Sequence, residues 1–161
     1  MATLIENGVF LVLPALIALV AIINGLRAWV GYRIVRAEAA GEYDTRLARG
    51  LVDTRLDRER FESAYVRTHA PRAQLWTALG LGAVVVLTVP ALLLMDAFMT
   101  MVWRMSGENR TFEPTFLVYQ FGIFFGVIAL WAAIGYVAAR AYHRSAPVSF
   151  EMEIQRELGE L

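Results

Sequence analysis

The chain has 161 residues, 58% of them hydrophobic, and its 15 basic and 15 acidic residues give a formal net charge of zero. The apolar share exceeds the roughly 45–50% of an ordinary soluble domain, and the balanced charge argues against nucleic-acid binding, which needs a basic patch. With no Cys, the chain cannot form disulfides, Cys-ligated zinc sites or iron–sulfur clusters. A chain of this length is expected to form a single domain, 1–161.

Three stretches, 9–30, 75–101 and 116–139, are candidate membrane spans. The first contains one charged residue, Arg27, the second contains only Asp96, and the third contains none. A bilayer core requires about 20 predominantly apolar residues, and the stretches lack the polar face that helices of a soluble bundle would show. The sequence therefore predicts an all-α integral membrane protein with three transmembrane helices. The first stretch lacks the basic start of a signal peptide, so we expect it to remain as a helix.

The distribution of arginine predicts an orientation. All basic residues are Arg, which indicates a GC-rich bacterial genome. Nine lie in segment 31–74 and three in 140–161, against two in 102–115 and none in 1–8. Because basic residues accumulate on the cytoplasmic side, we predict a multi-pass protein of the bacterial inner membrane. Its N-terminus and the loop 102–115 face the periplasm, and the loop 31–74 and the tail 140–161 face the cytoplasm.

Both cytoplasmic segments contain helical patterns. In the loop 31–74, apolar residues recur at roughly helical spacing among alternating charges. This predicts one or two amphipathic helices, with a break near Gly50 if there are two, that end before Pro71. Pro71 is expected in the first turn of the second span. The bilayer surface, the chain's own spans and another subunit all remain open as partners of the apolar stripe.

The tail predicts a short C-terminal helix. Ser149 is a candidate N-cap, and Phe150, Ile154, Leu158 and Leu161 form one apolar stripe in a segment of negative charge. Anionic lipid headgroups would repel such a helix. We therefore expect it to meet a basic protein surface, with a solvated, frayed tail as the alternative.

Asp96 is the most unusual residue of the spans. An intramembrane carboxylate costs about 2.5–3.5 kcal/mol to insert, so it should face protein or water. We interpret it as a hydrogen-bonded packing residue, with a proton or ion site as the alternative. Asn24 and Gln120 are expected to form hydrogen bonds between helices. Pro90, with Thr88 bonding back to Val84, predicts a kink in the second span.

Small residues mark the expected contacts between helices, because they let two backbones approach closely. Gly122 and Gly126 have GxxxG spacing, and Ala129 and Ala133 continue nearly the same face of the third span. In the first span, Ala21 and Gly25 have the same spacing, as have Ala78 and Gly82 in the second.

Arginines near the cytoplasmic ends of the spans predict contacts with lipid headgroups, including those of cardiolipin. These residues are Arg27, Arg33, Arg36, Arg72, Arg140 and Arg144. The only histidines, His69 and His143, also lie at these ends. A haem would need ligands from facing helices, and no other residue pattern points to a metal or a cofactor.

Together these features predict a non-catalytic accessory subunit that stabilises, bridges or helps assemble a multi-subunit inner-membrane complex. A respiratory or photosynthetic electron-transfer complex is the expected host, with other membrane subunits and lipid as partners. The basis is a set of surfaces without partners: the small-residue faces, the amphipathic loop and the acidic tail. One alternative is a small haem or quinone anchor that uses Asp96, His69 and His143. Another is a homo-oligomeric channel or transporter assembled through Gly122 and Gly126.

Overall fold

The computed structural model describes residues 9–160, with side chains from residue 12 onward, and every regular element in this range is helical. The predicted segment 1–8 and the last residue of the tail stripe, Leu161, lie outside the described residues. Three of the helices are long and apolar enough to cross a membrane, which confirms an all-helical chain with three candidate spans. Along the chain the elements are α2 (Val9–Ala48), α3 (Arg58–His69), α4 (Arg72–Met105), the 3-10 helix η1 (Arg110–Phe112), α5 (Leu117–Arg144) and α6 (Phe150–Glu157).

Helix α2 is much longer than the predicted first span. Its 40 residues correspond to roughly 60 Å, because the helix continues through 31–48, where Ala, Arg and Glu favour it. It ends just before Gly50, whose φ of 69° suits a glycine. The amides of Gly50 and Leu51 donate to the carbonyls of Leu47 and Arg46 at 3.0 and 2.9 Å, the pattern of a Schellman cap. The predicted break near Gly50 is confirmed.

Helix α3 is the second helix of the predicted loop. The Asp57 carboxylate accepts a hydrogen bond from the Arg60 amide at 2.8 Å and caps the first turn. The helix ends at His69, before Pro71 as predicted. Pro71 occupies the N-cap position of α4, one residue ahead of the first turn in which it was predicted, because its ψ of 64° is not helical.

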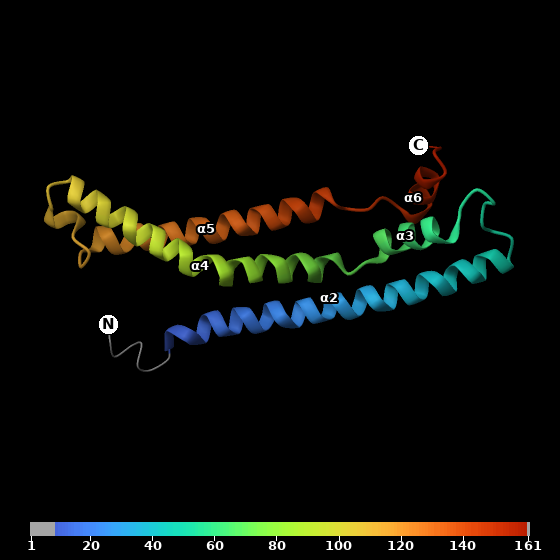
Figure 1. Ribbon diagram of the computed structural model, residues 1–161, viewed down its shortest axis with the longest axis horizontal. Helices are drawn as coiled ribbons and strands as arrows, with labels where there is room; N and C mark the ends of the chain where they lie inside the picture. The colour runs from blue at the N-terminus through green and yellow to red at the C-terminus, as the bar shows by residue number, and fades with distance from the viewer. Residues whose placement is uncertain (1–8, 161) are drawn as a thin grey trace.

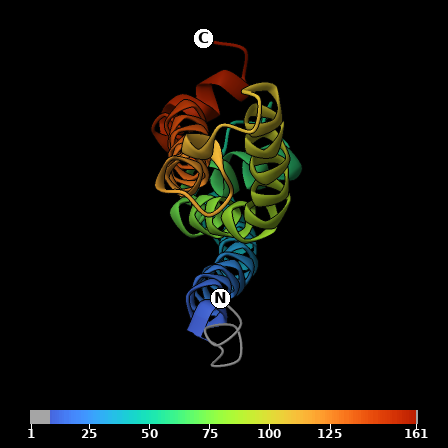
Figure 2. The ribbon, with the colours of Figure 1, turned by 90° about the vertical axis from the view of Figure 1, so that its left-hand side faces the viewer.

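The three long helices form an open row with α4 in the middle (Figure 1; Figure 2). Helix α4 packs against both α2 and α5, whereas no Cα atoms of α2 and α5 approach within 8 Å in the described residues. The spans therefore do not close into a bundle. Helix α5 runs antiparallel to α4 along most of its length.

Helix α4 bends near Pro90 (Figure 1), which confirms the predicted kink. Proline has no amide hydrogen to donate to the carbonyl four residues earlier. The Thr88 hydroxyl donates to the Val84 carbonyl at 2.5 Å, also as predicted. The Trp131 indole on α5 donates to the Thr88 hydroxyl at 2.9 Å. A polar contact between helices thus lies at the bend.

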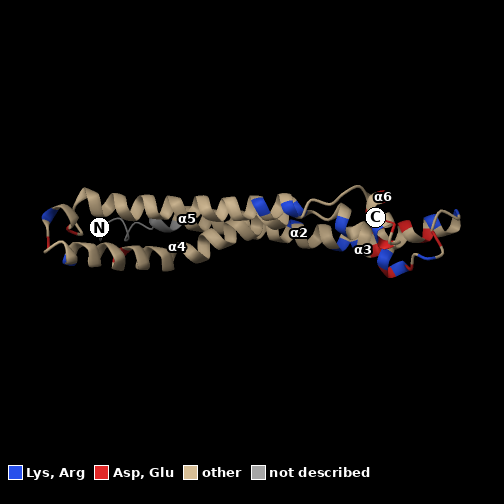
Figure 3. Ribbon diagram, turned by 90° about the horizontal axis from the view of Figure 1, so that it is seen from above, with Lys and Arg blue, Asp and Glu red and all other residues tan. Residues whose placement is uncertain are grey.

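Charged residues gather at the two ends of the molecule, and most lie at the end that holds α3 and α6, called the α3–α6 end below (Figure 3). The long stretch between the two ends is almost free of charge. This distribution matches the composition of a chain with three candidate spans.

Candidate functional site

Helix α6 packs on α3 through an aromatic cluster. The Phe150 ring lies 5.4 Å from the ring of Phe61 and 5.6 Å from that of Tyr65, both in edge-to-face geometry. The Arg46 guanidinium lies 5.0 Å from the centre of the Phe150 ring. The Ser149 hydroxyl accepts a hydrogen bond from the Met152 amide at 3.4 Å, so the predicted N-cap is confirmed. These contacts join α2, α3 and α6 at one end of the molecule.

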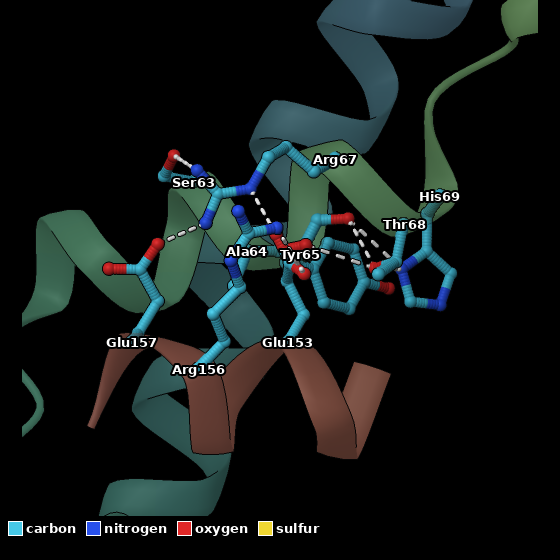
Figure 4. A network of polar contacts seen from close by, with 9 residues as sticks. All are labelled: Ser63, Ala64, Tyr65, Arg67, Thr68, His69, Glu153, Arg156 and Glu157. Atoms are coloured by element: carbon cyan, nitrogen blue, oxygen red, sulfur yellow. Dashed lines mark hydrogen bonds and ion pairs between the residues drawn. The ribbon is translucent and has the colours of Figure 1, made fainter. Parts of the chain in front are cut away.

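Arg67 of α3 joins this cluster to the acidic side of α6 (Figure 4). Its Nε lies 2.7 Å from Oε1 of Glu153, and its terminal nitrogen binds Glu157. Only 7% of the Glu153 side chain is exposed, which makes it the buried carboxylate of this cluster. Burial, together with the nearby carboxylates of Glu38 and Glu42, raises the pKa of Tyr65 in the same cluster.

The amphipathic loop and the acidic tail are therefore partners of each other. The loop stripe buries Phe61 and Ala64 against the chain's own helices. The tail meets a basic residue, as predicted, but one of the same chain. Each surface is therefore covered in part by the same chain, whereas Leu47, Leu51 and Met152 stay exposed. The expectation that both surfaces lack a partner is wrong for the covered part.

The six arginines predicted to contact headgroups lie at several different places in the structure. Arg33 and Arg36 line a pocket of about 370 Å³ beside Trp29, and the Arg33 guanidinium lies 4.7 Å from the centre of the Trp29 ring. Arg27 is exposed on α2. Arg140 donates to the Tyr136 hydroxyl at 3.0 Å. The pocket of Arg33 and Arg36 adjoins the one described next, because Tyr32 and Leu75 line both, whereas Arg27 and Arg140 line neither.

Arg72 and Arg144 meet in a second pocket of about 520 Å³ between α2, α3, α4 and the chain that leads into α6. We call it the basic pocket, and its lining includes Tyr32, Arg67, Arg72, Trp76, Arg144 and Arg156. Glu153 is the one acidic residue of the lining. Sequence reasoning missed Arg67 and Arg156, because only the packing of α6 on α3 brings them to this place.

The positive charges of the basic pocket are only partly neutralised. Arg72 donates to the Tyr142 carbonyl and to the Ser145 hydroxyl, both at 2.6 Å, and both acceptors are neutral. Among the described residues, no carboxylate lies within 4.0 Å of the Arg72 or Arg144 guanidinium. Glu153 is engaged by Arg67 at 2.7 Å and lies 4.0 Å from Arg156. The pocket therefore carries a net positive charge.

Asp96 lies at the contact between α4 and α5, toward the end that holds η1. The Tyr119 hydroxyl donates to its carboxylate at 2.5 Å and lies 3.1 Å from the Thr100 hydroxyl. Tyr119 is 3% exposed, and sequence reasoning missed it. The arrangement is that of a hydrogen-bonded packing residue. Within residues 9–160 no group of three His, Cys, Asp or Glu residues is placed to hold a metal ion.

The glycines of the GxxxG pattern face another helix of the same chain. A Cβ atom at Gly122 would lie 2.9 Å from the sulfur of Met99, and one at Gly126 would overlap the sulfur of Met95. On α2, Gly25 faces Ala78, with 3.9 Å between a built Cβ and the alanine Cβ.

The remaining small residues and the two amides lie elsewhere. Ala21 is half-buried, and Ala129 and Ala133 are exposed on α5. The Asn24 amide donates to the Val20 carbonyl at 2.9 Å, and the Gln120 amide donates to the Pro114 carbonyl at 3.1 Å. Both hydrogen bonds are local and do not join two helices of this chain.

The two histidines lie in different surroundings. The His69 ring stacks on the Tyr65 ring at 4.2 Å, whereas His143 borders an apolar groove of about 550 Å³ between α4 and α5. No hydrogen bond or ring contact joins the two histidines within residues 9–160.

The geometry defines a helical protein with three candidate membrane spans in an open row and a polar helical cluster at one end. Comparisons of the chain with models of protein families, with curated proteins and with solved structures find no match. The function of this chain is therefore inferred from the geometry of the chain itself.

Proposed function

We propose that the chain is a non-catalytic accessory subunit of a larger complex in the bacterial inner membrane, which it stabilises, bridges or helps to assemble. The observation that supports this proposal is the open row of spans. Since α2 and α5 lie on different sides of α4 without meeting, the described helices enclose neither a path nor a reaction chamber. We expect the host to be a respiratory or photosynthetic electron-transfer complex.

The N-terminal half of α2 offers an apolar surface to a partner. Beyond the Pro90 bend, α4 moves away from this part of α2 (Figures 1 and 2). The large apolar side chains exposed there are Val12, Leu13, Leu16, Leu19, Val20, Ile22 and Ile23. On α5, the exposed Ala129 and Ala133 leave room for the close approach of another helix. Both faces fit the spans of a second protein.

The two alternatives have less support. A homo-oligomer assembled through Gly122 and Gly126 would need a face that Met99 and Met95 of the same chain already cover. A haem anchor would need both histidines as ligands, and His69 instead stacks on Tyr65 while His143 borders the groove between α4 and α5.

Extraction of the tagged chain from the membranes of its own cells in mild detergent tests the proposal. On a native gel we expect the chain in a larger complex with different proteins, which mass spectrometry identifies. Migration at the 18.0 kDa of the free chain would refute the accessory role. Copies of the chain alone, detected with two different tags, would favour the homo-oligomer.

A matched pair of variants examines the α5 face. We expect Ala133→Leu to release the chain from the complex, because the bulkier side chain prevents close approach. Ala132→Leu adds the same atoms to the neighbouring exposed residue, which points in another direction, and should leave the complex intact.

The orientation has its own test. The chain contains no Cys, so single cysteines can be labelled without background. We expect Ser63→Cys to react with an impermeant thiol reagent only from the cytoplasmic side, and Ser106→Cys only from the periplasmic side. The opposite pattern would reverse the orientation.

A further inference from the structure

We propose that the basic pocket binds a negatively charged phosphate group, and that this group is the headgroup of an anionic phospholipid. The inference rests on the membrane orientation of the proposed function, but not on the accessory role. The residues that would hold the lipid are Arg72, Arg144 and Arg156, which line the basic pocket. Arg27, Arg33, Arg36 and Arg140 do not line it, although the pocket of Arg33 and Arg36 adjoins it at Tyr32 and Leu75.

The charge of the basic pocket favours a phosphate group. Four arginines and one glutamate line the basic pocket, and that glutamate is already paired with Arg67. Arg72 is bonded to neutral acceptors, and Arg144 has no carboxylate nearby in the described chain. Two guanidinium groups therefore have no counter-ion of their own. Guanidinium groups match the geometry of phosphate oxygens and are weakly hydrated.

The size and the closed sides of the basic pocket also suit a bound ligand. Its volume of about 520 Å³ falls in the roughly 300–1,000 Å³ range of ligand pockets. The chain around Ser145 closes one side because Arg72 is bonded to its hydroxyl at 2.6 Å, and α6 closes another through Arg67 and Glu153. Elements that are far apart in the sequence thus hold the arginines in place.

Apolar residues of the basic pocket distinguish a lipid from free phosphate. Tyr32, Leu75 and Trp76 form an apolar part of the lining, at the edges of the apolar stretches where membrane proteins place aromatic residues at the interface. Trp76 also lines the apolar groove between α4 and α5. An acyl chain attached to the headgroup can therefore lie against this groove. A free phosphate ion would gain nothing from these surfaces.

The test measures lipid retention by the purified full-length chain. The chain in detergent is mixed with phosphatidylglycerol or with phosphatidylcholine, and native mass spectrometry counts the lipids that remain bound. We expect selective retention of phosphatidylglycerol. Arg144→Gln should weaken it about fivefold, the usual contribution of one basic residue near an anionic lipid surface. Arg140→Gln removes an arginine from the same end of α5 but outside the pocket, and should leave retention unchanged.

A second arm identifies the source of the phosphate. Inorganic phosphate is added to the chain that carries phosphatidylglycerol. Failure to displace the lipid at millimolar phosphate supports the headgroup. Displacement that depends on Arg144 would overturn the lipid assignment in favour of a soluble phosphate.

Two results would overturn the proposal as a whole: equal retention of phosphatidylglycerol and phosphatidylcholine, or equal losses in Arg144→Gln and Arg140→Gln. The wild-type chain supplies a measurement that does not depend on the folding of variants. Raising the salt concentration must weaken the retention of phosphatidylglycerol, and retention that does not respond to salt contradicts the charge argument. Since all arms use the isolated chain, their outcome is separate from the search for a host complex.

Discussion

The docking of α6 on α3 should depend on the charge of Glu153. An isolated helix shorter than about 12–15 residues is marginal in water, and α6 has eight. Protection of its backbone amides against hydrogen exchange therefore measures how firmly it is docked on α3. Glu153→Gln keeps the size of the side chain and removes the charge that Arg67 binds at 2.7 Å.

The structure determines how much free energy of docking the loss of this charge should cost. An exposed ion pair contributes about 0.2–1 kcal/mol, and a hydrogen bond to a charged group contributes about 1.5–3 kcal/mol when it is shielded from water. Here 7% of the Glu153 side chain and 45% of the Arg67 side chain are exposed, so the pair lies between these cases. We expect a loss of about 1–2 kcal/mol, and therefore amide exchange roughly 5–30 times faster in α6.

Glu151→Gln is the matched control. Both Glu151 and Glu153 lie in the first turn of α6, where a negative charge interacts favourably with the helix dipole. Glu151 is exposed and forms no ion pair among the described residues, so the difference between the variants measures the ion pairs of Glu153, with Arg67 at 2.7 Å and Arg156 at 4.0 Å. Equal acceleration in both would refute the reasoning. In an Arg67→Gln background, the effect of Glu153→Gln should fall to that of Glu151→Gln.

Three further predictions address other parts of the molecule. Pro90→Ala should restore a helical hydrogen bond and straighten α4. For a bend of about 20°, straightening moves the C-terminal end of α4, roughly 22 Å beyond the proline, by about 8 Å. An unchanged distance between spin labels on α2 and on the C-terminal end of α4 would show that Pro90 does not cause the bend. Gly126→Leu should destabilise the protein by about 1–3 kcal/mol, because Met95 occupies the space that a side chain at this position would need. A Cβ built at Gly135 meets no atom within 4 Å. In detergent, Gly126→Leu should therefore lower the thermal unfolding temperature, and Gly135→Leu should not. Hydrogen bonds from the side chain and amide of Arg55 lower the pKa of Asp53 to about 2. The contribution of the Asp53 carboxylate to stability is therefore present above about pH 4 and is lost as the pH falls toward 2. Carboxyl NMR titration should show that Arg55→Gln raises this pKa, and an unchanged pKa would disprove the assigned cause.

The features that could be predicted from the sequence act over short distances. A long run without charges defines a candidate span wherever it occurs, and three such runs became α2, α4 and α5. Gly50 and Pro90 each change the conformation of their own backbone, so the break and the bend were both predictable. The unbroken continuation of the first span through residues 31–48 was not predicted, because hydropathy marks where apolar residues stop and not where the helix stops.

The contacts that define the candidate site depend on tertiary packing. Arg67 and Glu153 are separated by most of the chain, and each sequence pattern alone showed only a helix with charges. The same holds for Tyr119, which reaches Asp96 from the neighbouring helix. Gly126 was identified as a packing residue, but its partner Met95 could not be named, because the partner depends on how two helices are aligned.

Docking of α6 and occupation of the basic pocket should be thermodynamically linked. The pocket takes Arg72 from the start of α4 and Arg156 from α6, so a ligand that contacts both binds the docked form more tightly than the undocked form. The coupling must be equal in both directions: phosphatidylglycerol should slow amide exchange in α6, and Glu153→Gln should weaken retention of the lipid in proportion to the fraction of α6 that it undocks, at most by the factor by which the lipid protects α6 from opening. Retention that is unaffected by Glu153→Gln, in a variant whose α6 exchanges faster, would show that the arginines of α4 and α5 bind the headgroup without α6.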